Sequence, residues 1–369
     1  MKILLLGEYS NVHWTLAQGL RTLGHQVTVV SNGDFWKNYP RDINLVRRPG
    51  KLGGILYLIK LYWILPRLRN YDIVQLVNPM FLELKAKRIF PVYRYLRKHN
   101  LKIFLGAYGM DYYWVHSGCT DMPLRYSDFN IGNQLRDTPD ALKERRDWLG
   151  TDKQRLNEMI ANDCDRIIAG LYEYWVSYHP LFPEKTSFIP YPIQIKDAEI
   201  HDKSKNNDHK LKLFIGINRS RSVYKGTDIM LKAAQDIVQK YPLEAELQIA
   251  ENVPFTQYQE MLRNADVILD QLYSYTPSMN PLEAMSQGTI CVGGGEPENY
   301  EILNETELKP IVNVEPNYDS VYQNLEKLVL HPQNIGLLKR QTILYVKRHH
   351  DYLKVAKQYE QQYFMALQQ

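Results

Sequence analysis

The residues with the clearest chemical potential lie in one stretch, residues 270–295, DQLYSYTPSMNPLEAMSQGTICVGGG. Asn280 is a favoured helix N-cap and Pro281 suits the first helical position, so we expect a helix to begin there. Leu282 would face the core. A helix N-terminus offers unpaired N–H groups and a partial positive charge, and open α/β sheets bind phosphorylated ligands at this edge. The stretch therefore predicts a phosphate site with Glu283 one turn away.

Two roles are open for the Glu283 carboxylate, which lies three residues after Asn280. In a capping box it would accept a hydrogen bond from the backbone N–H of Asn280. In a binding site it would accept hydrogen bonds from the ribose hydroxyls of a nucleotide whose phosphates meet the helix end. The two roles do not exclude each other.

A cluster of cations follows the expected strand LKLFIGI, where Arg219, Arg221 and Lys225 lie within seven residues. Lys225 and Gly226 immediately precede an expected helix. Several cations in one loop can neutralise the charge of a departing diphosphate, although a solvated charge cluster is the alternative. The next expected strand, AELQIAEN, ends at Glu251, a candidate neighbour of the nucleotide base.

The chain opens with an expected strand, KILLL, followed by a loop and a helix, and this loop contains a single glycine, Gly7. The dinucleotide fingerprint needs three glycines and an acidic residue after the second strand, so an NAD enzyme is disfavoured. A later expected strand, KIFLGA, runs into a loop that ends at Asp111. That carboxylate could take or orient the proton of an acceptor hydroxyl, or could bond its own backbone in a turn.

Composition limits the class of protein. A length of 369 residues favours two domains. No run of 18 apolar residues is present, and the opening MKILLLGEYS turns polar too soon for a signal peptide. Cys119, Cys164 and Cys291 have no metal-ligand spacing. We therefore expect a cytoplasmic protein with no metal.

Charge is unevenly distributed along the chain. Residues 1–110 hold eight Lys and nine Arg against five acidic residues, a balance of +12 within a total of +4. Two basic segments rich in apolar and aromatic residues lie there, 47–69 and 85–98. They are either ordinary helices with snorkelling cations or a surface for anionic lipid, where each basic residue adds about 1 kcal/mol. The second interpretation predicts peripheral attachment to the inner face of a membrane.

The segment PLEAMSQGTICVGG resembles the loop, helix and strand of retaining GT-B glycosyltransferases of the large family 4. That family has one Glu, seven residues, and a second Glu. Glu283 matches the second, which the resemblance assigns to the donor ribose. The first, which contacts the donor sugar, falls at Tyr275; Ser278 or a backbone N–H is a candidate substitute. Lys225 and Gly226 also match, and the family's arginine corresponds to Arg219 or Arg221.

The N-terminal segment has a similar resemblance, in which Gly7, Ser10 and His13 match the loop that faces the acceptor and the donor diphosphate. Alternatively, His13 is only a half-exposed residue at a helix start. The family has no cofactor other than its nucleotide diphosphate sugar substrate.

The motif Asp163-Cys164-Asp165 is formally the DxD of metal-dependent glycosyltransferases of the other fold. It precedes an apolar strand instead of following one, so we interpret it as coincidence.

The resemblance implies an α/β protein with two Rossmann-like domains facing a cleft, the GT-B arrangement. We place the acceptor domain at residues 1–193, the linker at 194–210 and the nucleotide-sugar domain at 211–340. Residues 341–369 would form a C-terminal helix that packs back on the first domain. Residues 117–150 look like an insertion on the acceptor side.

The implied activity is transfer of a sugar, with retention, from a nucleotide diphosphate sugar to the hydroxyl of a carbohydrate or lipid-linked acceptor, for instance in surface polysaccharide assembly. Two alternatives stay open: a nucleotide-sugar epimerase of the same fold, and a glycan- or nucleotide-binding protein without catalysis, which the absent first Glu favours. Nucleic acid is not an expected partner.

Overall fold

The computed structural model describes residues 1–195 and 210–369 and forms two compact units. The first unit holds residues 1–117, 144–192 and 352–369, and the second holds 118–143 and the described part of 193–351. This division differs from the predicted domains in two places. Residues 118–143 belong to the second unit, and the return to the first unit begins at Tyr352, not at residue 341. The predicted linker lies almost wholly outside the described residues.

The first unit is built on a seven-stranded parallel sheet with the order β3-β2-β1-β4-β5-β8-β9. Its strands are β1 (Lys2–Leu6), β2 (Gln26–Ser31), β3 (Ile43–Asn44), β4 (Ile73–Leu76), β5 (Lys102–Ala107), β8 (Arg166–Ala169) and β9 (Thr186–Phe188). Apolar runs such as KILLL form these strands because both faces of a parallel sheet are covered by helices. The chain reverses direction across the sheet between β1 and β4, which is the switch point where such sheets bind ligands.

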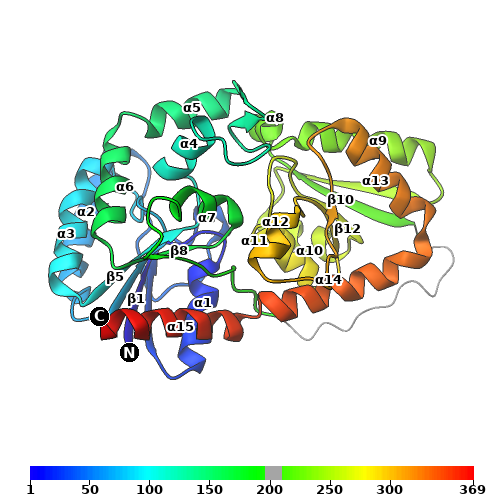
Figure 1. Ribbon diagram of the computed structural model, residues 1–369. Coiled ribbons are helices and arrows are strands. Elements are labelled where there is room, and N and C mark those ends of the chain that lie inside the picture. The colour runs from blue at the N-terminus through cyan, green and yellow to red at the C-terminus, as the bar shows by residue number, and fades with distance from the viewer. Residues whose placement is uncertain (196–209) are drawn as a thin grey trace. The chain divides into compact units, whose positions relative to one another are not determined.

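Helices cover both faces of this sheet (Figure 1). The helices of this unit are α1 (Val12–Thr22), α2 (Gly50–Ile64), α3 (Ala86–His99), α6 (Asp152–Asp163), α7 (Tyr172–Tyr178) and α15 (Tyr352–Gln368). Two more helices, α4 (Tyr112–Cys119) and α5 (Pro139–Trp148), lie where the chain passes from one unit to the other. The last helix, α15, packs along α1, and its Tyr359 and Tyr363 are fully buried. His25 and Glu360 pair at 2.7 Å between Nε2 and Oε1. The predicted C-terminal helix is therefore present, and it closes the first unit.

The second unit is built on a five-stranded parallel sheet with the order β11-β10-β12-β13-β14. The strands are β10 (Leu211–Ile217), β11 (Ala245–Glu251), β12 (Val267–Leu269), β13 (Ile290–Gly293) and β14 (Val312–Asn313). The helices are α8 (Ser222–Lys225), α9 (Thr227–Lys240), α10 (Phe255–Arg263), α11 (Met279–Ser286), α12 (Pro297–Ile302), α13 (Tyr318–Leu330) and α14 (Ile335–His349). The switch point lies between β10 and β12, so the loops that follow these strands are the expected ligand-binding edge.

Within the described residues, no helix combines the length and the apolar content needed to cross a bilayer.

Candidate active site

The two regions predicted to bind phosphate lie together at the switch point of the second sheet. Lys225 ends α8, and its backbone carbonyl accepts a hydrogen bond of 3.0 Å from the N–H of Leu272, in the loop after β12. Gly226 has φ +72°, and a Cβ there would lie 2.8 Å from the Cβ of Leu272. Only glycine allows both this backbone conformation and this approach. The Lys225 turn and the loop of residues 270–278 therefore form one surface.

Asp270 is a residue of this surface that the sequence interpretation missed. It follows β12 directly, and burial raises the pKa of its carboxyl to about 6, although the nearby charge of Lys225 acts to lower it. A carboxyl of this kind titrates close to neutral pH, beside a cation expected to meet phosphate. An acidic residue at the end of a buried strand was the signal that could have identified it.

The predicted arginines occupy the exposed side of the same turn. Arg219 pairs through its Nε with Glu251, which lowers the pKa of the Glu251 carboxyl, and the Arg219 side chain is 82% exposed. The Arg221 guanidinium lies 5.1 Å from the centre of the Tyr224 ring. Arg219 and Glu251 were assigned separate ligand contacts, and the structure pairs them with each other.

The helix predicted to have Asn280 as its N-cap begins two residues earlier. Helix α11 starts at Met279, its N-cap is Ser278, and the Ser278 side chain makes no capping hydrogen bond. Asn280 instead donates through Nδ2 to the hydroxyl of Tyr258 at 2.9 Å. The assignments of Asn280 as N-cap and Pro281 as first helical residue are therefore wrong, because the extended residue before the helix is Ser278.

This shift changes the interpretation of Glu283. With Ser278 as N-cap, a capping-box glutamate would stand at position 281, which is proline, so the capping-box role for Glu283 is excluded. Glu283 is exposed, whereas Leu282 before it is fully buried as predicted. Its role as a ribose contact stays a prediction.

In the first unit, the loop after β1 is held by buried polar contacts. The Glu8 carboxylate accepts hydrogen bonds from the N–H groups of His13 (3.1 Å) and Trp14 (2.9 Å), so it caps α1. Burial raises the pKa of Glu8 to about 8. Ser10 takes a left-handed backbone, with φ 49°, and its hydroxyl accepts from the Lys37 amine at 3.0 Å. Sequence interpretation missed Glu8, a buried acid directly before a helix.

His13 is fully buried and not half exposed. Its Nδ1 lies 2.9 Å from the carbonyl of Gly7, while its Nε2 is buried with no partner among the described residues. Burial lowers the pKa of His13 to about 4, so the ring is neutral at physiological pH. The contact between Nδ1 and the Gly7 carbonyl holds the loop to the start of α1, and the buried Nε2 is closed off from solvent.

A cavity of about 780 Å³ opens at the switch point of the first sheet. Its walls include Gly7 and Glu8 after β1, Asn32 after β2, Tyr57 of α2 and Met80 after β4. Neither Ser10 nor His13 is part of its lining. Volume and position are those of a small-molecule site.

Asp111 lies in the interior of the first unit. Its carboxylate accepts hydrogen bonds from the Trp114 N–H at 2.9 Å and the Tyr178 hydroxyl at 2.7 Å, so it caps α4. Burial raises the pKa of Asp111 to about 7. It is not among the residues that line the cavity. Its hydrogen bond from the Trp114 N–H is a local backbone contact, the role that the sequence analysis gave as the alternative to catalysis.

Comparison with known proteins gives no match to a family model or to a curated protein sequence. Several solved structures match in fold. Sucrose-phosphate synthase from Thermosynechococcus elongatus is 12% identical over 99% of both chains, with a TM-score of 0.63. Anabaena HepE in complex with UDP-glucose is 13% identical over 98% of both chains, with a TM-score of 0.60. The chain has the GT-B fold.

A third solved structure that matches in fold is described as another class of enzyme. The putative UDP-N-acetylglucosamine 2-epimerase from Listeria monocytogenes is 10% identical, covers 97% of this chain and 94% of its own, and has a TM-score of 0.54. A GT-B fold by itself therefore does not distinguish transfer from epimerisation.

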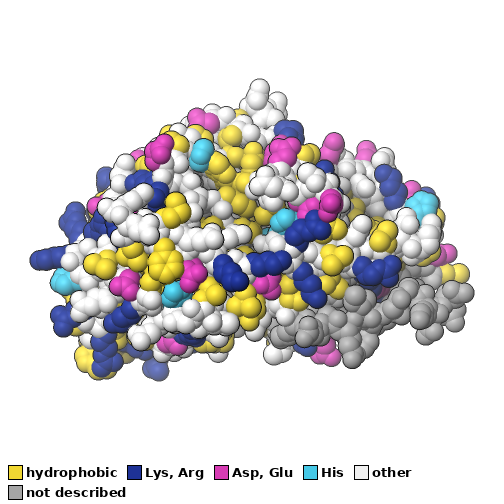
Figure 2. All heavy atoms as spheres, turned by 60° about the horizontal axis from the view of Figure 1, so that its bottom comes forward, with side chains coloured by type: hydrophobic (Ala, Val, Ile, Leu, Met, Phe, Trp, Pro, Cys, Tyr) yellow, Lys and Arg dark blue, Asp and Glu magenta, His cyan; other side chains and the backbone are white. Residues whose placement is uncertain are grey.

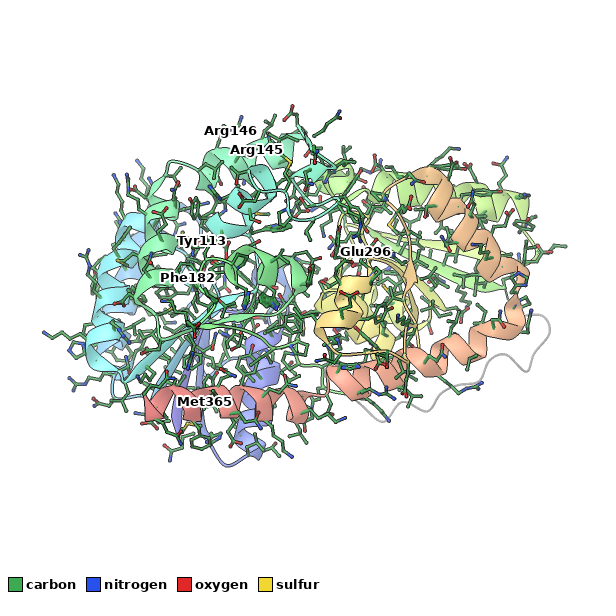
Figure 3. All side chains as sticks on the ribbon, in the orientation of Figure 1. Tyr113, Arg145, Arg146, Phe182, Glu296 and Met365 are labelled. Carbon is green, nitrogen blue, oxygen red and sulfur yellow. The ribbon has the colours of Figure 1, made fainter. Side chains whose placement is uncertain are left out.

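Tyr275 stands where the GT-B resemblance expects the first glutamate, and its side chain contacts other residues of the second unit. Tyr275 is 1% exposed, and its hydroxyl accepts a hydrogen bond of 2.7 Å from the Arg125 N–H. The Arg125 guanidinium lies 4.9 Å from the Tyr275 ring centre and pairs with Glu296 and Glu298. Glu296, labelled in Figure 3, directly precedes α12. The sequence interpretation expected residues 117–150 on the acceptor side, whereas Arg125 belongs to the second unit.

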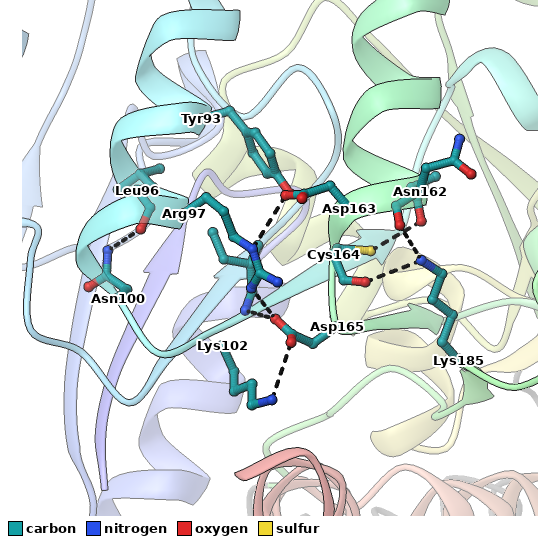
Figure 4. A network of polar contacts seen from close by, with 12 residues as sticks. Tyr93, Leu96, Arg97, Asn100, Lys102, Asn162, Asp163, Cys164, Asp165 and Lys185 are labelled. Carbon is teal, nitrogen blue, oxygen red and sulfur yellow. Dashed lines mark hydrogen bonds and ion pairs between the residues drawn. The ribbon is translucent and has the colours of Figure 1, made fainter. Parts of the chain in front are cut away.

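The formal DxD motif has structural partners in the GT-B first unit (Figure 4). Asp163 accepts a hydrogen bond from the Tyr93 hydroxyl at 2.6 Å, and Asp165 pairs with Arg97 at 2.6 Å. Asp165 also accepts from the N–H of Ile103, the second residue of β5. The two carboxylates thus tie the end of α6 to α3 and β5.

Aromatic side chains complete the packing beside this motif. Tyr113 and Phe182, both labelled in Figure 3, meet edge to face with ring centres 5.4 Å apart. Among the described residues, no group of three or more His, Cys, Asp or Glu side chains is placed to hold a metal ion.

Proposed function

We propose that this protein transfers a sugar, with retention of configuration, from a nucleotide diphosphate sugar to an acceptor hydroxyl. One observation carries the proposal: the Lys225 turn and the 270–278 loop, which leads into α11, form one surface at the switch point of the second sheet. A cation near a helix N-terminus is suited to a leaving diphosphate. The GT-B fold, shared with HepE in complex with UDP-glucose, supports this assignment.

Each residue has a defined part in the proposed reaction. The Lys225 ammonium and the N-terminus of α11 neutralise charge that develops on the diphosphate as the glycosidic bond breaks. Arg219 and Arg221 add positive charge on the exposed side of the turn, and Glu283 accepts hydrogen bonds from the ribose. We propose that no metal and no cofactor are required, because protein cations and N–H groups supply the charge stabilisation.

The acceptor hydroxyl is assigned to the cavity of the first unit. The Gly7 loop and the buried Glu8 lie at its wall. A carboxyl with a pKa near 8 exchanges protons at neutral pH, as an acceptor hydroxyl requires when it becomes a glycoside oxygen. Ser10 and His13 hold the loop, and Asp111 positions α4.

We further propose that the acceptor is presented at an anionic membrane surface. The outer face of α2 exposes Leu52 (70%), Ile59 (62%), Trp63 (63%) and neighbouring apolar residues, while its inner face places Tyr57 at the cavity wall. Lys and Arg side chains gather at the left edge of Figure 2, on the side where α2 and α3 lie in Figure 1. Apolar side chains among cations are typical of interfacial helices. A lipid-linked acceptor in surface polysaccharide assembly suits such a face.

The alternative function is epimerisation of a nucleotide sugar, which the fold likeness to the Listeria protein supports. Incubation of purified protein with radiolabelled UDP-glucose, UDP-N-acetylglucosamine or GDP-mannose distinguishes the candidates. Release of nucleoside diphosphate, increased by anionic vesicles that contain isoprenyl-phosphate acceptors, is the expected result. Conversion to a second nucleotide sugar would identify an epimerase, and binding without any turnover would identify a non-catalytic protein.

A further inference from the structure

Residues 118–143, which we call the arm, leave the first unit and fold as part of the second. The arm contains a short antiparallel hairpin, β6 (Asn130–Ile131) and β7 (Gln134–Leu135). Asn130 is fully buried, and its side-chain amide donates to the carbonyls of Leu124 and Gly132 at 2.8 and 2.9 Å. The arm therefore has a fixed conformation of its own.

One end of the arm contacts the turn that carries Lys225. Arg136 is 7% exposed, and its Nη2 donates to the carbonyls of Val223 and Tyr224 at 3.0 Å each. These carbonyls belong to the single turn of α8, which ends at Lys225. Carbonyls at a helix C-terminus lack partners within the helix, so a guanidinium stabilises them.

The same guanidinium also reaches the loop after β12. Its central carbon lies 3.4 Å from the centre of the Tyr273 ring, a stacked cation–π contact, while its Nη1 donates to the Ser127 carbonyl of the arm at 3.0 Å. The planar, forked guanidinium makes these contacts together, which a lysine ammonium cannot do. Arg136 therefore joins the arm, the Lys225 turn and the 270–278 loop.

The other end of the arm contacts the loops after β12 and β13. The Arg125 N–H donates to the Tyr275 hydroxyl, and its guanidinium pairs with Glu296 at 2.6 Å and with Glu298. The Tyr126 hydroxyl donates to Glu296. Because β10, β12 and β13 are neighbours in the sheet, the arm bridges the three loops at its carboxyl edge.

We infer that the arm sets the geometry of the donor site, and that Arg136 is a positioning residue for Lys225. This inference rests on the proposed function, because it gives the arm a role at the nucleotide-sugar site. Arg136 acts through the backbone of α8 and through Tyr273, without touching the donor. Its loss lets the Lys225 turn move relative to the 270–278 loop, so that the two no longer meet one diphosphate.

The test compares Arg136→Met and Arg136→Lys with Arg263→Met, a control that removes an exposed arginine from α10 of the same unit. Calorimetric titration with UDP, GDP and ADP gives the affinity at a temperature where every variant is folded, and hydrogen exchange gives the protection of residues 222–227 and 271–276. We expect Arg136→Met to weaken nucleotide binding at least tenfold and to lose protection in both segments. Arg136→Lys should fall between it and the wild type, and the control should match the wild type.

A purely structural role would appear differently. If Arg136→Met melts earlier but binds the nucleotide within threefold of the wild type, the positioning role is overturned and the proposed function stands. If that variant does not fold, Tyr273→Leu, which removes only the ring beneath the guanidinium, replaces it, and affinity equal to that of the wild type again overturns the role. If the wild type binds none of the three nucleotides, the proposed function fails and takes the inference with it.

Discussion

At the scale of single residues, the proposed donor site depends on Lys225. Its turn is fixed by the Leu272 contact and by the left-handed Gly226, so the ammonium can stabilise charge without reorganisation. Lys225→Ala should lower turnover at saturating donor by about 10²- to 10³-fold, the usual effect of removing one preorganised electrostatic group. Steady-state release of nucleoside diphosphate measures it.

The control for this change is Lys232→Ala, which removes an exposed lysine of α9 that pairs with Asp236 at 2.7 Å. Surface pairs of this kind contribute little to stability. Turnover of Lys225→Ala close to that of the wild type would remove the lysine from the proposed mechanism.

Asp270 makes the stability of the second unit depend on pH. Burial raises the pKa of its carboxyl in the folded protein to about 6, above the ordinary value of 3.8, so the folded state binds more protons than the unfolded state between these values. Stability from this group is therefore full below about pH 4 and is lost as pH rises through 6. Asp270→Asn removes this pH dependence. The free energy of unfolding of the variant, relative to that of the wild type, should therefore increase by about 2 kcal/mol between pH 4 and pH 7. Chemical denaturation at several pH values measures the difference, and a constant difference would contradict the assignment.

Residue types and spacing indicated part of the surface at the switch point of the second sheet, and its role as a donor site stays a prediction. Lys225-Gly226 and the 270–295 stretch were recognisable because a turn glycine, a strand and a helix start are local signals. Arg136 and Arg125 were not, because their partners lie about 90 to 170 residues away. Asn280 shows the limit of local signals as well, since Ser278 and Asn280, two residues apart, can both cap a helix and only tertiary packing selects one.

At the scale of elements, α2 has two faces with different surroundings. Gly53, Tyr57 and Leu61 are buried against the first unit, while Leu52, Ile59 and Trp63 are exposed. The sequence GILYLIKLYWI is apolar all round, so periodicity could not separate the two faces. A helix with this composition on the surface suits the headgroup region of a bilayer.

The membrane proposal therefore predicts that Leu52→Ser, Ile59→Ser and Trp63→Ser together release the protein from anionic vesicles, with at least a tenfold loss of bound fraction. Replacing Arg47, Arg48, Lys51 and Lys60 by Gln should have a similar effect, which salt should mimic. Sedimentation with vesicles of phosphatidylglycerol and phosphatidylcholine measures binding. Leu243→Ser and Leu337→Ser, at exposed leucines of the second unit, form the control. A wild type that does not sediment with such vesicles would contradict the proposal.

At the scale of the whole molecule, the order of elements was predictable and the division of the chain was not. Two strand–helix repeats, a polar linker and a final helix indicated two Rossmann-like domains. The sequence singled out residues 117–150 as an insertion but placed it on the acceptor side, because the composition of residues 118–143 does not distinguish one domain from the other. Their assignment to the second unit depends on contacts such as that of Arg136 with Tyr224, which the pattern of hydrophobic residues in the sequence does not predict.

This division gives a prediction for ligand binding. A nucleotide diphosphate that binds only the folded second unit should raise the melting temperature of that unit, because binding at 100 times Kd adds about 2.7 kcal/mol to its stability. For a unit of this size the shift is about 5 to 10 °C. The first unit should keep its own transition unless the two units unfold together. Differential scanning calorimetry with UDP, GDP and ADP measures both transitions, with the Lys225→Ala variant as the matched control. The base with the largest shift identifies the donor class, whereas a wild type and a Lys225→Ala variant that shift equally would place the diphosphate away from the Lys225 turn.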